Sequence, residues 1–304
     1  MKNKEIAEKI QRLKKEKNAV ILVHNYQNPE VQDIADFLGD SLGLSRKAAT
    51  TDADIIVFCG VYFMAETAKI LSPQKKVIIP DKNSGCPMAD MITKEQLTEL
   101  KKKHLKAKVL TYVNSSAQVK SESDLCCTSS NSVKVVEVAF RKNQEVIFVP
   151  DKYLAQYTAS RTGRKFIIWQ GYCPTHAKIM PEDIKKQKKI HPGAKVMVHP
   201  ECRPETIKLA DAALSTSGMI KFAKETDAKD IIVGTEAGMV YPLKKEAPKK
   251  NFYPAKEEAT CPNMKKTNLE KVLWALEDLS YEVKIDNEII QKGQKSIQAM
   301  LDLS

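Results

Sequence analysis

Three cysteines, each followed by proline, recur at an even interval along the 304-residue chain. They are Cys86, Cys173 and Cys261, and the intervals between them are 87 and 88 residues. Since only 14 residues of the chain are proline, three evenly spaced Cys-Pro pairs are difficult to attribute to chance. The interval is also far longer than the C-x2–4-C spacing of a zinc finger. The pattern therefore indicates three copies of one structural unit, each bringing one thiol to a shared site.

Three converging thiolates suit a metal ion or a metal cluster. A four-iron cluster normally has four cysteine ligands, so three cysteines would leave one iron with an open position. An open iron is a Lewis acid, which can bind a carboxylate, hydroxyl or amine and assist the loss of hydroxide. Two other interpretations remain open on spacing alone. The cysteines could be buried structural residues, or they could hold a structural zinc completed by His199 or His176.

Two further sets of polar residues follow the same interval. One set ends an apolar run and lies 61 or 62 residues before each cysteine: His24, Tyr112 and His199. The other set opens a predicted helix and lies 44 or 45 residues before each cysteine: Ser41, Ser129 and Thr216. Ser and Thr are ordinary N-caps, but three helix starts facing one site also offer N–H groups and positive dipole ends. We therefore expect a small, polyanionic ligand.

The elements that would position these residues are the strands of parallel sheets. Buried apolar runs alternate with helical patterns three times over. Strands are predicted at residues 19–23, 55–58 and 77–79, at 109–113, 146–149 and 166–169, and at 195–198, 231–233 and 251–253. This alternation predicts an α/β fold of three pseudo-threefold-related, three-layer αβα domains with short parallel sheets. Ligands bind at the carboxyl ends of such strands, so the site is expected at the central junction of the domains.

The same interval gives the expected domain boundaries. We expect αβα repeats at residues 1–87, 88–174 and 175–262, followed by a helical segment at residues 263–304 that packs back on them.

Charge and hydropathy narrow the class of protein. The first twenty residues contain no apolar core of a signal peptide, and the apolar stretch at residues 55–65 is too short for the ~18 residues that span a bilayer. We therefore expect a cytoplasmic protein with no membrane partner. The odd number of cysteines argues against a disulfide framework. The net charge of +11 comes mainly from lysine, with only six arginines, and is typical of solvated helix faces.

Several long motifs, in order from near residue 20 to near residue 280, resemble those of the quinolinate synthase family. They include HNYQNPEVQDIADFLGDSL, FCGVYFMAETAKIL, TYVNSSAQVK, CCTSSN, GYCPTH, VHPECRPE, STSGMI, VGTEAGM and CPNMKKTNLEKVL. The resemblance implies an enzyme of NAD biosynthesis that condenses iminosuccinate with dihydroxyacetone phosphate to give quinolinate, phosphate and two waters. It also implies three similar domains, a 4Fe-4S cluster with three Cys ligands and one open iron, and an iminosuccinate-forming enzyme as supplier, without a nucleic-acid partner.

The resemblance also implies the site residues, motif by motif. The implied cluster ligands are Cys86, Cys173 and Cys261. The implied proton carriers are Tyr26, Tyr112, His199 and Glu201. The implied substrate contacts are His24, Ser41, Tyr112, Val113, Asn114, Ser129, His176, His199, Pro200, Glu201 and Thr216. The chain departs from the family pattern at Tyr62, where histidine is common, and at Pro87, where serine or alanine is frequent.

Two other functions stay open at this stage. A cluster-based redox sensor that binds nucleic acid would explain the lysines, although the chain shows no helix-turn-helix pattern and no arginine-rich helix. Another cluster-dependent hydro-lyase would share the open iron and differ in substrate. The remaining cysteines are interpreted as packing residues: Cys59, Cys126, Cys127 and Cys202. For the adjacent pair Cys126 and Cys127, a strained redox disulfide is the alternative.

Overall fold

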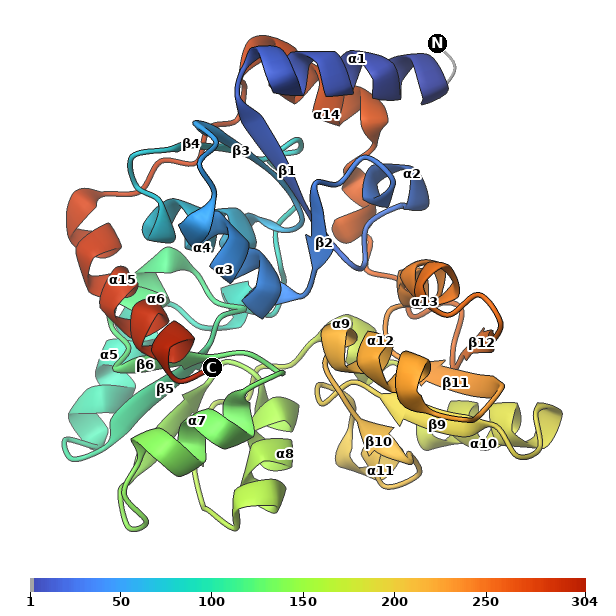
Figure 1. Ribbon diagram of the computed structural model, residues 1–304. Coiled ribbons are helices and arrows are strands. Elements are labelled where there is room, and N and C mark those ends of the chain that lie inside the picture. Colours follow the sequence, from blue (N-terminus) through green and yellow to red (C-terminus); the bar gives the residue numbers. More distant parts are fainter. Residues whose placement is uncertain (1–2) are drawn as a thin grey trace.

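The computed structural model describes residues 3–304, which form three parallel sheets of four strands each (Figure 1). The first sheet consists of β1 (Ala19–His24), β2 (Phe37–Gly39), β3 (Ile55–Cys59) and β4 (Lys76–Ile78). The second consists of β5 (Lys108–Tyr112), β6 (Leu125–Cys127), β7 (Val146–Val149) and β8 (Ile167–Ile168). The third consists of β9 (Lys195–Val198), β10 (Ala212–Ala213), β11 (Asp230–Gly234) and β12 (Asn251–Pro254). The predicted α/β fold of three parallel units is confirmed.

All three sheets have the same strand order, in which the second strand in sequence lies at one edge, followed by the first, third and fourth. The edge strands β2, β6 and β10 were absent from the prediction, so each unit has four strands instead of three. They contain only two or three residues and, unlike the equally short β4 and β8, no β-branched residue that would mark a strand in the sequence. Each pairs with the first strand of its sheet.

Helices connect successive strands and cover the sheets (Figure 1). In the first unit they are α1 (Asn3–Glu16), α2 (Pro29–Gln32), α3 (Ser41–Thr50) and α4 (Tyr62–Leu71). In the second unit they are α5 (Lys94–Lys103), α6 (Ala117–Ser121), α7 (Ser132–Ala139) and α8 (Lys152–Thr162). In the third unit they are α9 (Pro174–Ala177), α10 (Pro181–Ile190), α11 (Pro204–Ile207), α12 (Thr216–Glu225) and α13 (Val240–Glu246). Short 3-10 turns follow at Ala89–Met91, Ala237–Met239 and Met264–Lys266.

One aspartate fixes the first strand of every sheet in the same way. Asp36, Asp124 and Asp211 each accept a hydrogen bond at 2.8 Å from the backbone N–H of a residue 15 positions earlier. Each carboxylate also pairs with a lysine, at N···O distances between 2.5 and 3.0 Å. Because side chains and backbone repeat together, these contacts support the threefold repetition independently of the cysteines.

The last two helices pack back on the earlier elements (Figure 1). Helix α14 (Leu269–Asp278) lies against α1 and β3. Helix α15 (Asn287–Asp302) lies against α4 of the first unit and against α6 and β6 of the second, so it joins these two units. No helix within residues 3–304 has both the length and the apolar character that a bilayer span requires.

Candidate active site at the junction of the three units

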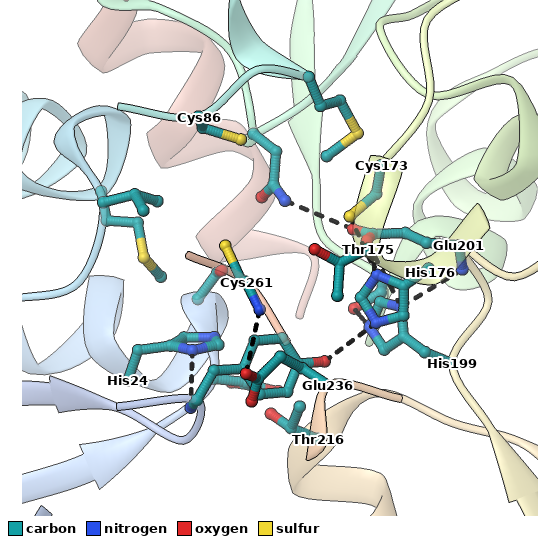
Figure 2. A pocket seen from close by; sticks show the side chains of 18 of the residues that line it. His24, Cys86, Cys173, Thr175, His176, His199, Glu201, Thr216, Glu236 and Cys261 are labelled. Atoms are coloured by element: carbon teal, nitrogen blue, oxygen red, sulfur yellow. Dashed lines mark hydrogen bonds and ion pairs between the residues drawn. The ribbon is translucent and has the colours of Figure 1, made fainter. Parts of the chain in front are cut away.

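Strand ends and helix starts from all three units surround one cavity of about 70 Å³ (Figure 2). All but two of the residues that the sequence singled out line this cavity. The exceptions are Val113, whose side chain is buried in the core of the second unit, and Pro200, which is buried beside the cavity. The structure thus brings together groups that are up to 237 residues apart, such as His24 and Cys261.

The three repeated cysteines face this common space, as Figure 2 shows. All three are free thiols. Burial raises the pKa of Cys86 to about 12, and burial also raises the pKa of Cys173 and of Cys261. Proximity adds to this effect, because Cys261 raises the pKa of Cys86, which in turn raises that of Cys173. Such thiols hold their protons until a metal displaces them, so the donor set fits a cluster with three cysteine ligands.

The other four cysteines are buried, and none of them lines the cavity. Cys202 donates to the backbone oxygen of Gly234 at 3.4 Å, and Cys126 donates to Oγ of Ser296 at 3.5 Å. The adjacent Cys126 and Cys127 are free thiols in strand β6. These contacts are of the kind that packing residues make.

Glu201 connects the second and third units at the centre of the site. Its Oε1 accepts a hydrogen bond from Oη of Tyr112 at 2.5 Å and from Nδ2 of Asn114 at 3.4 Å. Its Oε2 lies 2.6 Å from Nδ1 of His176 and 3.8 Å from Nδ1 of His199. Burial opposes the negative charge, but the His176 imidazole and the Tyr112 hydroxyl outweigh it and lower the pKa of Glu201. The site therefore contains a carboxylate at neutral pH.

Tyr26 belongs to a second network, which meets the first at His176. Its Oη lies 2.6 Å from Oγ1 of Thr235 and 3.3 Å from Nε2 of His176, and the same Nε2 lies 2.8 Å from Thr235. Burial raises the pKa of Tyr26 and of Tyr112, and the charge of Glu201 adds to both shifts. Both phenols are therefore neutral, which suits them as proton donors.

His24 and His199 occupy equivalent places after the first strands of their sheets. Nδ1 of His24 accepts the N–H of Tyr26 at 3.2 Å, and Nδ1 of His199 accepts the N–H of Glu201 at 3.3 Å. Burial lowers the pKa of His24 to about 4 and that of His199 to about 3, so both rings are neutral at pH 7. A neutral ring with Nδ1 accepting carries its proton on Nε2. Nε2 of His199 lies 3.2 Å from Oγ of Ser129.

The three predicted helix starts differ in detail. Ser41 and Thr216 are the first residues of α3 and α12, whose caps are Asp40 and Ser215. For Ser129 the prediction of a helix start is wrong by three residues, since α7 begins at Ser132. The cause is Asn131, whose Oδ1 accepts the N–H of Thr128 at 2.7 Å and closes a turn before the helix.

Several cavity residues were missed by the sequence interpretation, among them Asp40, Thr175 and Glu236. Thr235 also belongs to the network around Tyr26 although it was not predicted. The positions of Thr235 and Glu236 in the sequence do indicate a role, because both directly follow the apolar run that forms β11. The rule that ligands bind at the carboxyl ends of parallel strands would have found them.

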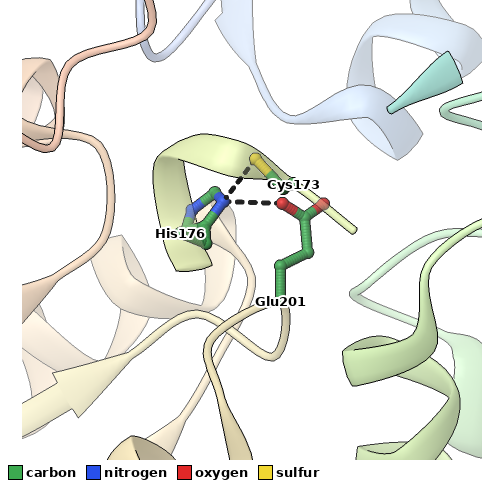
Figure 3. Close-up of side chains that lie close together, drawn as sticks. All are labelled: Cys173, His176 and Glu201. Atoms are coloured by element: carbon green, nitrogen blue, oxygen red, sulfur yellow. Dashed lines mark hydrogen bonds and ion pairs between the residues drawn. The ribbon is translucent and has the colours of Figure 1, made fainter. Parts of the chain in front are cut away.

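Cys173 has a second set of potential ligands beside it (Figure 3). Nδ1 of His176 lies 3.1 Å from its Sγ, and one ligand atom each from Cys173, His176 and Glu201 lies within 4.8 Å of the others. Thiolate, imidazole and carboxylate are all ligands of divalent transition metals. Cys173, His176 and Glu201 are thus able to bind metal, either one iron of a cluster or a single metal ion.

Comparison with known proteins gives close matches. Residues 8–302 match the family described as quinolinate synthetase A protein. A quinolinate synthase of Dehalococcoides mccartyi (strain CBDB1) is 55% identical over 296 residues, which are 97% of this chain and 97% of that protein. Quinolinate synthase 1 of Methanosarcina acetivorans is 52% identical over 301 residues, 99% of this chain and 98% of that one. A quinolinate synthase of Thermodesulfovibrio yellowstonii is 52% identical over 298 residues, 97% of both chains.

Proposed function

The chain belongs to the quinolinate synthetase A family, and on that premise we propose that its central cavity condenses iminosuccinate with dihydroxyacetone phosphate. It is an enzyme of the quinolinate synthase kind, which serves NAD biosynthesis. The products are quinolinate, phosphate and two waters. The observation that carries the proposal is the meeting of three thiols from three units with a buried network of tyrosine, histidine and glutamate in one cavity.

The proposed cofactor is a 4Fe-4S cluster held by Cys86, Cys173 and Cys261. The support is that these thiols share one cavity and that none of them is in a disulfide. When bound, such a cluster with an open iron supplies a Lewis acid for the loss of hydroxide in the dehydration steps.

Binding of the anionic substrates has to rely on polar groups, because no lysine or arginine is among the cavity-lining residues in the described part of the chain. The first turns of α3 and α12 offer N–H groups and a positive dipole end, and the hydroxyls of Ser41, Ser129 and Thr216 are nearby. Oδ1 of Asn114 is buried and has no hydrogen-bond partner within residues 3–304. We propose that it accepts a hydrogen bond from the substrate, which would satisfy this atom.

Proton movement is assigned to the two networks. Tyr26 is a neutral phenol next to Thr235 and His176, so it is suited to donate a proton and to regain one along that chain. Tyr112 donates a hydrogen bond to Glu201 over 2.5 Å, so the carboxylate orients this neutral phenol, and Glu201 is the group of the pair that can accept a proton from the substrate. His199 presents a neutral Nε2–H toward Ser129, which suits it for holding a developing negative charge.

Two coarser proposals accompany the activity. We propose domain boundaries near residues 87, 174 and 262, supported by the presence of one sheet of identical strand order in each interval. We also propose a cytoplasmic location, supported by seven free thiols, which a reducing compartment preserves. An iminosuccinate-forming enzyme would then supply the unstable substrate.

The decisive experiment is anaerobic reconstitution of the protein with iron and sulfide, followed by an assay for quinolinate with iminosuccinate and dihydroxyacetone phosphate. We expect about four irons per chain and quinolinate formation that stops on exposure to oxygen. A loaded protein that forms no quinolinate but dehydrates another hydroxy acid would instead establish the hydro-lyase alternative. A protein that takes up no cluster would refute the proposal.

A further inference from the structure

Two buried acidic side chains contact the backbone of two of the three site cysteines. Oδ2 of Asp151 accepts the backbone N–H of Cys173 at 3.2 Å, and Oε1 of Glu236 accepts the backbone N–H of Cys261 at 3.1 Å. Both side chains have an exposed fraction of 0%. They follow β7 and β11, the third strands of their sheets, and precede their cysteines by 22 and 25 residues. They therefore occupy corresponding places in two of the repeated units.

The second oxygen of each carboxylate fixes the turn into the next helical element. Oδ1 of Asp151 accepts the N–H of Leu154 at 2.7 Å and caps α8. Oε2 of Glu236 accepts the N–H of Gly238 at 2.7 Å and caps the 3-10 turn Ala237–Met239. Each carboxylate thus ties the cysteine loop to the end of a central strand and to the start of a helix, which are rigid parts of the unit.

Burial of these acidic groups is costly, because an ionised carboxylate loses several kcal/mol of hydration on transfer to a protein interior. At Asp151 the cost appears as a pKa that burial, together with the charge of Glu201, raises well above its ordinary value. Glu236 is partly compensated by Lys265, whose Nζ lies 3.1 Å from Oε1. Asp151 has no ion pair within residues 3–304 and depends on backbone N–H donors. A cap alone does not require this burial, since exposed caps such as Thr93 serve equally well. The cost points to a role at the cysteines themselves.

The first unit lacks this arrangement. Asp81 lies in the loop of Cys86, but its Oδ1 accepts the N–H of Asn83 at 2.8 Å and its Oδ2 pairs with Lys271 at 2.6 Å. Neither oxygen reaches the N–H of the cysteine. Two of the three cysteine loops are therefore tied to their strands by a carboxylate, and the third is not.

We propose that Asp151 and Glu236 are positioning residues that hold the loops of Cys173 and Cys261 in the geometry that the cluster requires. This rests on the proposed function, because it assumes that the three cysteines bind the cluster. Three sulfurs from three units must be in place at once, and a loop that moves freely would have to be ordered at each binding event. Loss of the hydrogen bond between the carboxylate and the cysteine N–H should therefore speed up the loss of the cluster while the fold remains intact.

The sharpest test uses Asp151→Ser. Serine is as good an N-cap as aspartate, so the cap on α8 is kept, but the shorter side chain offers no second oxygen to Cys173. Glu236→Gln tests the third unit, since its amide retains one acceptor and places a donor against the other N–H. The control is Asp124→Asn, which removes an exposed carboxylate that accepts the N–H of Val109 and pairs with Lys108, and that makes no hydrogen bond to a site cysteine within the described residues.

The measurements are iron and sulfide per chain after anaerobic reconstitution, the rate at which an iron(II) chelator removes the cluster, and the melting temperature of the metal-free protein. We expect Asp151→Ser and Glu236→Gln to lose the cluster ~10-fold faster than the wild type, as expected if about 1.4 kcal/mol of binding energy is lost. The metal-free melting temperatures should fall no further than that of Asp124→Asn.

Wild-type chelation rates in both carboxylate variants would overturn the inference and leave the proposed function in place. Failure of the wild type to take up a cluster would refute the proposed function instead. Equal acceleration in Asp124→Asn would show a general loosening of the fold and would also overturn the inference. If Asp151→Ser does not fold, Asp151→Asn, which is also a good N-cap, replaces it in the same assays.

Discussion

The seven side chains that form the two proton networks lie at or just after the ends of four strands, β1, β5, β9 and β11, except His176, which lies in α9. Hydrogen bonds between these elements hold the side chains in place. Tyr112 and Glu201 are joined across two units at 2.5 Å, and Tyr26 reaches the same network only through Thr235 and His176. A change to any one of these side chains therefore removes a hydrogen bond from its partners as well. Single-residue predictions must therefore preserve shape and remove one atom or one function.

The first prediction concerns the cysteines. Cys86→Ala, Cys173→Ala and Cys261→Ala should each abolish the brown absorbance of the cluster and the activity, because each removes one of the three thiols that line the cavity. Cys59→Ala and Cys202→Ala should keep the cluster, since both thiols are buried away from the cavity. Absorbance spectra and iron content after reconstitution check the pattern. A stable cluster in any of the first three variants would contradict the threefold site.

The second prediction concerns Tyr26→Phe, which removes only the hydroxyl that contacts Thr235 and His176. The ring remains packed, so the protein should fold and load its cluster normally. We expect turnover to fall ~100-fold or more, the range typical for loss of a general acid or base. Steady-state assays under anaerobic conditions measure this effect. Thr235→Val is the companion variant, and near-normal turnover in both would transfer the proton role to Glu201 and His199.

The third prediction concerns acid sensitivity. Burial lowers the pKa of His24 to about 4, well below its ordinary value of 6.5, so between these pH values the unfolded chain binds a proton that the folded chain refuses. Stability should therefore be fully present above pH 6.5 and fall as the pH drops toward 4, by about 1.4 kcal/mol per pH unit for this group. Urea denaturation of the metal-free protein at pH 7 and pH 5.5 measures the slope.

The control for this slope is His24→Asn, whose Oδ1 can accept the N–H of Tyr26 as Nδ1 does but does not titrate. Its stability should depend less steeply on pH in the same interval. Identical slopes in wild type and variant would show that His24 is not the group responsible.

At the scale of elements, a buried lysine ties the first unit to the second. Nζ of Lys120 in α6 donates to the backbone oxygens of Phe63 and Ser115 at 3.3 and 2.7 Å and to Oγ1 of Thr67 at 2.8 Å. The side chain is fully buried, and Ser296 of α15 donates to its backbone oxygen at 2.9 Å. Three helices thus meet at one residue, directly after the segment that carries Tyr112 and Asn114.

The fourth prediction follows from these contacts. Lys120→Met keeps most of the volume but removes the donor that three buried acceptors share, so the free energy of unfolding should fall by about 2–4 kcal/mol. Of the three, the Phe63 oxygen keeps a hydrogen bond from Oγ1 of Thr67. Lys102→Met is the control, because Lys102 is exposed and pairs with Glu99 on the same helix; it should change stability by less than about 0.5 kcal/mol. Urea denaturation compares the two. Equal effects would contradict the role of Lys120.

The predictability of the strands followed the apolar run in which each lies. The first and third strands of each sheet are buried apolar runs of four to six residues, and their positions were predicted to within one or two residues. The short strands β4 and β8 were also predicted, because they contain β-branched residues in apolar runs. The edge strands β2, β6 and β10 have no such residues, and their pairing depends on the neighbouring strand, so they were missed. The turn that displaces Ser129 from a helix start likewise depends on the side chain of Asn131, which no pattern of hydropathy reports.

For the whole molecule, the even spacing of three cysteines was sufficient to predict that three units share one site, because a repeated sequence folds into repeated structure. It was not sufficient to predict how the units are joined. That depends on long-range contacts such as α15 against α4 and α6, and Tyr241 and Lys245 of the third unit against Asp33 of the first. These pairs share no period, so only the folded structure reveals them.

The last prediction is that removal of the cluster leaves the molecule folded. A zinc finger unfolds without its metal because it has little core, whereas here apolar side chains of the first and third units form one continuous cluster, and α15 joins the first unit to the second. The metal-free protein should keep its circular dichroism spectrum and lose only the stabilisation that ligand binding adds, seen as a lower melting temperature. Reconstitution with iron and sulfide should then restore activity without a refolding step. Loss of secondary structure on chelation would show instead that the cluster, and not the apolar contacts between units, holds the three sheets together.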